Sequence, residues 1–257
     1  MTLPALFVSH GAPNIILHDS PTRRFLAGLG ETMGRPRAVV AISAHWEARV
    51  PTVGSTASPG TIHDFYGFEP AMYEMRYPAP GAPELAGEVA QSLRAAGLET
   101  LIDEQRGLDH GAWVPLKLMY PRADIPVMQL TVQTHESPRH HHLIGQILRD
   151  LREDNVLVLG SGNATHNLRE MMSGESNEPA WVTAFADWLR TAVTAGASVE
   201  LLEYRNNAPF AARNHPTEEH FLPLFVALGA GTPGVPGRII HSSTSFGVLA
   251  MDAFAFD

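Results

Sequence analysis

An unbroken apolar run that ends in a histidine is the feature that most limits how this chain can fold. Residues 39–46 read Val-Val-Ala-Ile-Ser-Ala-His-Trp, which carries His45 at the end of the run. The pattern recurs where residues 5–9 lead into His10, and where residues 156–160 lead through a Ser-Gly-Asn turn to His166. Short apolar runs bounded by Gly, Ser or Pro are typical of strands buried on both faces of a parallel sheet. The sequence therefore predicts three such strands, each followed by a histidine.

The three histidines are expected at one edge of the predicted sheet. In open parallel sheets, ligands bind beyond the carboxyl ends of the strands. If the strands are neighbours with one direction, His10, His45 and His166 converge there. The chain has no cysteine, so a metal would have to take imidazole, carboxylate or water ligands, which favours iron, manganese or zinc.

Length and charge narrow the class of protein. The 257 residues suffice for one large domain, and no repeat or change in composition divides them, so we expect a single α/β domain over residues 1–257. We expect a central, mostly parallel or mixed sheet flanked by helices. With 27 acidic against 18 basic residues and a formal charge of −9, nucleic acid is not an expected partner. A small molecule is expected instead, and the sequence is compatible with a homo-oligomer.

The N-terminus lacks the basic start of a signal peptide, and no apolar run reaches the roughly 20 residues of a membrane span. We therefore expect a cytoplasmic protein that does not enter a membrane.

Gly and Pro residues, which commonly lie at the ends of helices and strands, divide the remainder of the chain into further helices and strands. Residues 51–77 are too long and irregular for a simple connection, and their five aromatic side chains favour a folded loop over a pocket. Residues 107–113 are expected to be an irregular interruption, followed by a short apolar helix or turn that reaches residue 120. The other expected helices are residues 21–30, 83–97, 138–151 and 179–193, and the other expected strands are residues 126–132, 199–204, 238–241 and 246–256.

His220 lies in a segment that resembles the start of a helix. Thr217 is a good N-cap, which places His220 at the third helical position. The positive end of a helix disfavours a charged ring there, so a neutral His220 would be available to a cation. Glu218 and Glu219 are competing ligand candidates, or surface charges that complement the helix dipole.

The remaining histidines have plainer interpretations. His63 and His110 each lie beside an aspartate, and each is either a solvated loop residue or an acid or base. The run 140–142 occupies the start of an amphipathic helix and is assigned to packing or surface roles. The turn at residues 160–163 resembles a phosphate cradle only weakly, because it lacks the third glycine and the acidic partner of that motif.

Taken together, these motifs resemble the class III, LigB-like extradiol ring-cleavage dioxygenases of the DODA type. The resemblance covers nearly the whole chain, and its specificity comes from the combination of motifs in order. The motifs are Ser9-His10-Gly11, Ser43-Ala44-His45-Trp46, His63-Asp64-Phe65-Tyr66-Gly67-Phe68, Leu108-Asp109-His110-Gly111, Gly162-Asn163-Ala164-Thr165-His166-Asn167 and His215-Pro216-Thr217-Glu218-Glu219-His220.

The resemblance implies a metal-dependent oxidoreductase that inserts both atoms of O2 into a catechol, with Fe(II) for activity and Zn(II) able to enter the same site. It implies His10, His45 and His220 as metal ligands, and His166 as a fourth ligand or an acid/base. It also implies a catalytic role for His110. The wider class uses two histidines and a carboxylate, so Glu218 or Glu219 is the alternative third ligand.

Substrate contacts are expected from the loop and from one residue near the last ligand. Phe65 and Tyr66 are expected to wall the aromatic ring, and His63 and His215 to contact the substrate. Two other functions stay open. One is a zinc-dependent hydrolase of an amide or ester with a glutamate base. The other is a metal-binding or ligand-binding module without catalysis.

Overall fold

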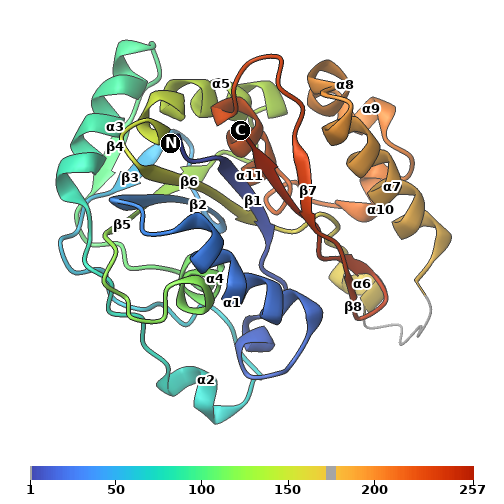
Figure 1. The fold of residues 1–257 in the computed structure, drawn as a ribbon, viewed down its shortest axis with the longest axis horizontal. Helices are drawn as coiled ribbons and strands as arrows, with labels where there is room; N and C mark the ends of the chain where they lie inside the picture. The colour runs from blue at the N-terminus through green and yellow to red at the C-terminus, as the bar shows by residue number, and fades with distance from the viewer. Residues whose placement is uncertain (1, 172–177) are drawn as a thin grey trace.

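One eight-stranded sheet organises the part of the chain that the structure, a computed structural model, describes: residues 2–171 and 178–257 (Figure 1). The strand order is β4-β3-β5-β2-β6-β1-β10-β7. The strands are β1 (Ala5–Ser9), β2 (Ala38–Glu47), β3 (Thr52–Gly54), β4 (Leu101–Asp103), β5 (Val127–Val132), β6 (Val156–Gly162), β7 (Arg238–His241) and β10 (Ala253–Phe256). A separate hairpin pairs β8 (Thr244–Ser245) with β9 (Leu249–Ala250).

The centre of the sheet is parallel and its flanks are mixed. Strand β6 pairs in parallel with both β1 and β2, and β2 pairs in parallel with β5. Strands β3 and β10 join antiparallel to β5 and β1. All residues of β1, β5 and β6 are buried, as expected for strands covered on both faces. The prediction of one α/β domain around a mostly parallel, mixed sheet is therefore confirmed.

Helices cover both faces of this sheet (Figure 1). Helices α5 and α11 pack against each other, and α11 lies on β6 and β1. Helix α4 packs on β2, and α1 packs against α4. The helices are η1 (Pro13–Ile16), α1 (Pro21–Met33), α2 (Pro70–Glu74), α3 (Pro83–Ala95), α4 (His110–Met119), α5 (Pro138–Leu148), η2 (Arg149–Arg152), α6 (Leu168–Met171), α7 (Ala180–Thr194), α8 (Ser198–Leu202), α9 (Tyr204–Asn207), α10 (Ala211–Asn214) and α11 (Leu222–Ala230). No helix in the described ranges is both long and apolar enough to cross a bilayer.

Alternate residues of β6 face the two helical layers. A Cβ on Gly160 would lie 2.3 Å from the carbonyl oxygen of Pro223, in α11. The hydroxyl of Ser161 points the other way and donates to the carbonyl oxygen of Gly111, in α4. Because successive side chains of a strand point to opposite faces, this strand connects both layers at its carboxyl end.

Most of the predicted elements are confirmed. Ser20 caps α1 by accepting from the Arg23 N–H group at 3.1 Å, and Gly97 follows α3 with φ +85°. Helix α1 continues to Met33, past its predicted end at Gly30. Gly30 lies where α1 meets α4, and a Cβ on this residue would come within 1.9 Å of the Met119 carbonyl oxygen. This glycine allows α1 to approach α4 and does not end the helix.

Two local predictions are wrong. Residues 199–204 form helices α8 and α9, because Leu201 and Tyr204 share a buried helical face, whereas Val199 is 69% exposed. His220 is not at the third position of a helix. Helix α11 starts at Leu222, with a proline in its first turn, and the Thr217 hydroxyl donates to Glu219 instead of capping a helix.

Candidate metal centre

Five histidines converge at the carboxyl ends of the central strands. His10 follows β1, His45 ends β2 and His166 follows β6, as the strand pattern predicts. His110 begins α4, and His220 precedes α11. The backbone of His220 reaches the cluster because Gly162 lies beneath it, and the Asn163 N–H group donates to the His220 carbonyl oxygen at 2.9 Å.

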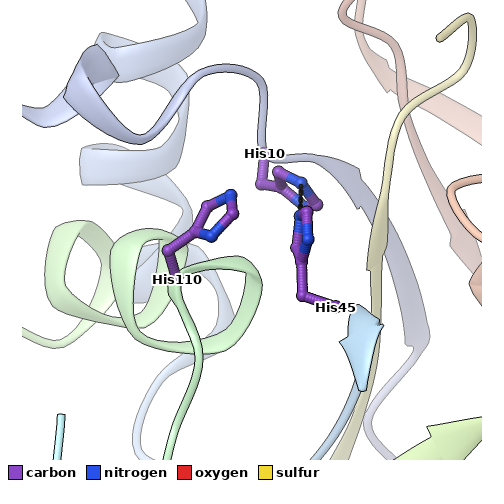
Figure 2. A group of neighbouring side chains, drawn as sticks. All are labelled: His10, His45 and His110. Carbon is purple, nitrogen blue, oxygen red and sulfur yellow. Dashed lines mark hydrogen bonds between the residues drawn. The ribbon is translucent and has the colours of Figure 1, made fainter. Parts of the chain in front are cut away.

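The rings of this cluster lie close to one another. Nε2 of His10 lies 3.1 Å from Nε2 of His45, and Figure 2 shows the His110 ring pointing toward these two rings. The His45 ring centroid is 3.9 Å from that of His110 and 4.8 Å from that of His220. The His166 ring stacks on His220 at 3.4 Å.

The donor atoms form two adjacent groups. The first consists of His10, His45 and His110, and the second of His166, Glu219 and His220; within each group the donor atoms lie within 4.8 Å of one another. The structure therefore brings together all four histidines expected to bind metal, and it places His110 as near to the first pair as His220.

The two glutamates that precede His220 have different partners. Glu218 turns away from the cluster, where it accepts from the Tyr204 hydroxyl at 2.6 Å and from Arg205. Oε1 of Glu219 lies 2.9 Å from Nδ1 of His220 and 3.8 Å from Nδ1 of His166. Of the two carboxylates considered from the sequence, only Glu219 is in the cluster.

Hydrogen bonds behind the rings determine which nitrogen carries a proton. Ser161 donates its hydroxyl proton to Gly111, so it can only accept from Nδ1 of His10, 3.0 Å away. Glu219 in the same way accepts from Nδ1 of His220. Both rings are thereby left with an unprotonated Nε2, the arrangement that outer hydrogen bonds impose on metal-binding histidines.

The rings of His10, His45, His166 and His220 are neutral at neutral pH. Burial, together with the charge of neighbouring histidines, holds the pKa of His10 and His220 well below the ordinary value. The same causes lower the pKa of His45 to about 3, and burial lowers the pKa of His166 to about 4. Buried, neutral imidazoles with free lone pairs fit a divalent transition metal such as iron or zinc.

A cavity of about 210 Å³ opens on the cluster. Its apolar wall includes Phe65, Phe68, Leu168 and Leu249, and Asn163 adds a polar side chain. Oδ1 of Asn163 accepts from the Gly11 N–H group at 3.0 Å, which orients the amide. A metal beside an apolar slot of this kind suits a flat aromatic ligand.

The expected substrate contacts are only partly on this wall. Phe65 lines the cavity, whereas Tyr66 is 90% exposed at the tip of the loop. His63 turns to the Met75 carbonyl oxygen at 3.0 Å. His215 is fully buried, its ring bonded to the Ala164 carbonyl oxygen at 2.9 Å, so it cannot contact a ligand in this cavity.

Several site residues were not anticipated. Ser161, Asn163 and Leu249 lie at the cluster or its cavity. Ser161 lies near the end of β6 and Asn163 follows that strand, so the only sequence signal for them was proximity to His166. Leu249 comes from the C-terminal hairpin and carries no signal of its own.

Comparison with known proteins decides among the candidate functions. The model of the catalytic LigB subunit of aromatic ring-opening dioxygenase matches residues 7–251. The chain belongs to the LigB family. It is 42% identical to a 4,5-DOPA dioxygenase extradiol of Beta vulgaris over 97% of this chain and 95% of that protein. It is 39% identical to a protein of the same name from Escherichia coli K12, over 97% and 93%.

A solved structure is also similar to this chain. An uncharacterized protein from Escherichia coli K12 superimposes with a TM-score of 0.85 at 33% identity, covering 99% of this chain and all of that one. Family and relatives together confirm the prediction of an enzyme, an oxidoreductase of the extradiol dioxygenase class. They speak against a hydrolase and against a module without catalysis.

Proposed function

We propose that this LigB-family enzyme opens the ring of a catechol, a DOPA-like or other dihydroxyphenyl compound, with O2 as the second substrate. The observation that carries the proposal is the convergence of neutral, buried imidazoles on a cavity walled by Phe65 and Phe68. The names of the relatives support a DOPA-like substrate.

We assign His10, His45 and His220 to the metal. His10 and His220 support the assignment because both are held with Nε2 unprotonated by Ser161 and Glu219. Fe(II) is proposed for activity, and Zn(II) for occupancy of the same all-imidazole site. When bound, Fe(II) would provide the path for electrons between the catechol and O2.

We assign proton transfer to His110 and His166, each of which lies against a different proposed ligand. The His110 ring lies 3.9 Å from that of His45, and the His166 ring lies 3.4 Å from that of His220. A neutral imidazole accepts a proton from a catechol hydroxyl, becomes an imidazolium, and returns that proton to an oxygen of the opening ring; the two histidines can alternate in this role. Phe65 and Phe68 hold the ring and exclude water.

The proposal is tested by oxygen uptake after metal-stripped protein is loaded anaerobically with Fe(II) and given a panel of catechols in air. Uptake equimolar with the catechol, together with a visible absorbance from the ring-opened product, is the expected result. His45→Ala should abolish it, whereas His135→Ala, at an exposed position, should not. Iron binding without uptake for any catechol would refute the proposal, and turnover by the zinc form without O2 would indicate a hydrolase.

A further inference from the structure

The carboxylate of Asp64 makes a close contact with His110 that the sequence pattern does not predict. Its Oδ1 accepts the backbone N–H of His110 at 3.0 Å and lies 3.0 Å from Nδ1 of the same residue. Its Oδ2 lies 3.9 Å from Nδ1 of His45. Asp64 thus reaches the first group of histidines from the loop that covers the cavity.

Nδ1 of His110 has Asp64 as its nearest acceptor. This nitrogen is fully buried and makes no well-aligned hydrogen bond within the described residues. The 3.0 Å contact with Asp64 is within hydrogen-bond distance but bent. A carboxylate accepts only, so the bond requires a proton on Nδ1 and leaves Nε2 of His110 bare.

We propose that Asp64 is a positioning residue that holds His110 in the Nδ1-protonated form, with Nε2 as the nitrogen that exchanges protons with substrate. The inference rests on the proposed function only in giving His110 a proton-transfer role. A neutral imidazole in water carries its proton mainly on the other nitrogen, so Asp64 reverses the intrinsic preference.

The same contact couples this base to the wall of the cavity. Phe65 follows Asp64 directly, and its ring lies 5.7 Å from that of His110, edge to face. One short segment therefore carries both the ring-binding wall and the acceptor that faces His110.

The loop has other attachments, so replacing Asp64 should leave it in place. The Ile62 N–H group donates to the Leu108 carbonyl oxygen at 2.8 Å, and Nε1 of Trp113 donates to the Ile62 carbonyl oxygen at 2.9 Å. Neither bond involves Asp64. Asp64→Ala therefore removes the carboxylate alone, and Asp64→Asn retains an acceptor oxygen.

The direct test is the protonation pattern of His110, read by long-range ¹H–¹⁵N correlation spectra of the ¹⁵N-histidine-labelled full chain. The zinc-loaded protein is used because it is diamagnetic, at about pH 8, above the ordinary imidazole pKa of about 6.5. His110→Gln assigns the signal. We expect Nδ1–H in the wild type and in Asp64→Asn, and Nε2–H in Asp64→Ala. An unchanged His110 signal in Asp64→Ala would overturn the proposal.

A kinetic comparison provides the second readout. Loss of an outer carboxylate partner typically lowers activity about 10- to 100-fold, and here we expect the loss in kcat, with partial rescue in Asp64→Asn. The matched control is Glu69→Gln in the same loop, whose carboxylate bonds Asn14 and His18. An equal loss of kcat in the control would overturn the role of Asp64. The spectra report on Asp64 even if the wild type consumes no oxygen, so the two proposals fail separately.

Discussion

Gly162 lies directly beneath His220, so close that a Cβ on residue 162 would come within 2.0 Å of the His220 carbonyl oxygen. Gly162→Ala must therefore push His220 away from the cluster. We expect a loss of about 1–3 kcal/mol in the free energy of unfolding from overpacking, together with weaker metal binding. Urea denaturation and competition with a chelator measure the two effects.

The control for that variant is Gly87→Ala, because Gly87 lies in helix α3 with no atom near its Cβ position. It should stabilise the protein by about 0.5–1 kcal/mol and leave metal binding unchanged. Equal stability of Gly162→Ala and the wild type would contradict the close approach.

Ser161 should matter for metal affinity through His10. Ser161→Ala removes the acceptor of Nδ1 of His10, so the ring loses the bond that fixes its orientation. We expect metal affinity to fall about 10- to 100-fold, as measured by chelator competition. Ser92→Ala, on the exposed side of α3, is the matched control. Unchanged affinity in Ser161→Ala would show that the His10 ring is held by packing alone.

The neighbouring glutamates should have different effects. Glu219→Gln weakens the acceptor of His220 Nδ1, so activity should fall about 10- to 100-fold with little change in stability. Glu218→Gln weakens bonds to Tyr204 and Arg205, so it should cost about 1–3 kcal/mol of stability and leave kcat nearly unchanged. Steady-state oxygen uptake measures the activity of both variants, and urea denaturation measures their stability. A loss of stability in Glu219→Gln together with a loss of activity in Glu218→Gln would contradict the prediction.

His141 should make the protein sensitive to acid. It is fully buried, accepts from the Gln133 N–H group at 3.1 Å, and bonds the Ser137 carbonyl oxygen. Burial lowers the pKa of His141 from 6.5 to about 4. A folded-state pKa below the unfolded one means that the unfolded state binds the proton first, so stability falls as the pH drops from 6.5 to 4.

The size of that effect is up to about 3 kcal/mol, at 1.36 kcal/mol for each pKa unit. His141→Leu removes the titrating group but leaves two backbone partners unpaired, so it should be less stable than the wild type at neutral pH. The difference in free energy of unfolding between the two proteins should shrink as the pH falls. Urea titrations at several pH values measure this difference. A difference that stays constant with pH would refute the claim that His141 makes the protein sensitive to acid.

The strand pattern predicted the part of the site that depends on backbone direction. His10, His45 and His166 each follow a buried run, and parallel neighbours necessarily deliver them to one edge. The helix argument for His220 failed, although the residue is in the cluster. Pro223 lies in the first turn of α11, and Glu219 takes the Thr217 hydroxyl that was expected to cap an earlier start.

Contacts between residues that are far apart in the sequence could not be predicted from strand or helix periodicity. Asp64 meets His110, which is 46 residues away, through a loop whose path no periodicity describes. His215 was expected at the substrate because it is near His220 in sequence, yet its ring packs against Phe185 and Phe221. Side-chain direction in irregular segments depends on tertiary packing, which a single sequence does not display.

The register of β6 with its two neighbours has a consequence for how this protein tolerates change. Ser9 pairs with Gly162, and Ser43 pairs with Ser161, so the spacing of His10 and His45 is set by ladder hydrogen bonds. Insertions in the outer loops leave that spacing intact, whereas one residue added within β6 would turn Ser161 to the opposite layer. The surroundings of the cavity are therefore free to diversify in evolution or in the laboratory, while the distances between the histidines stay constant.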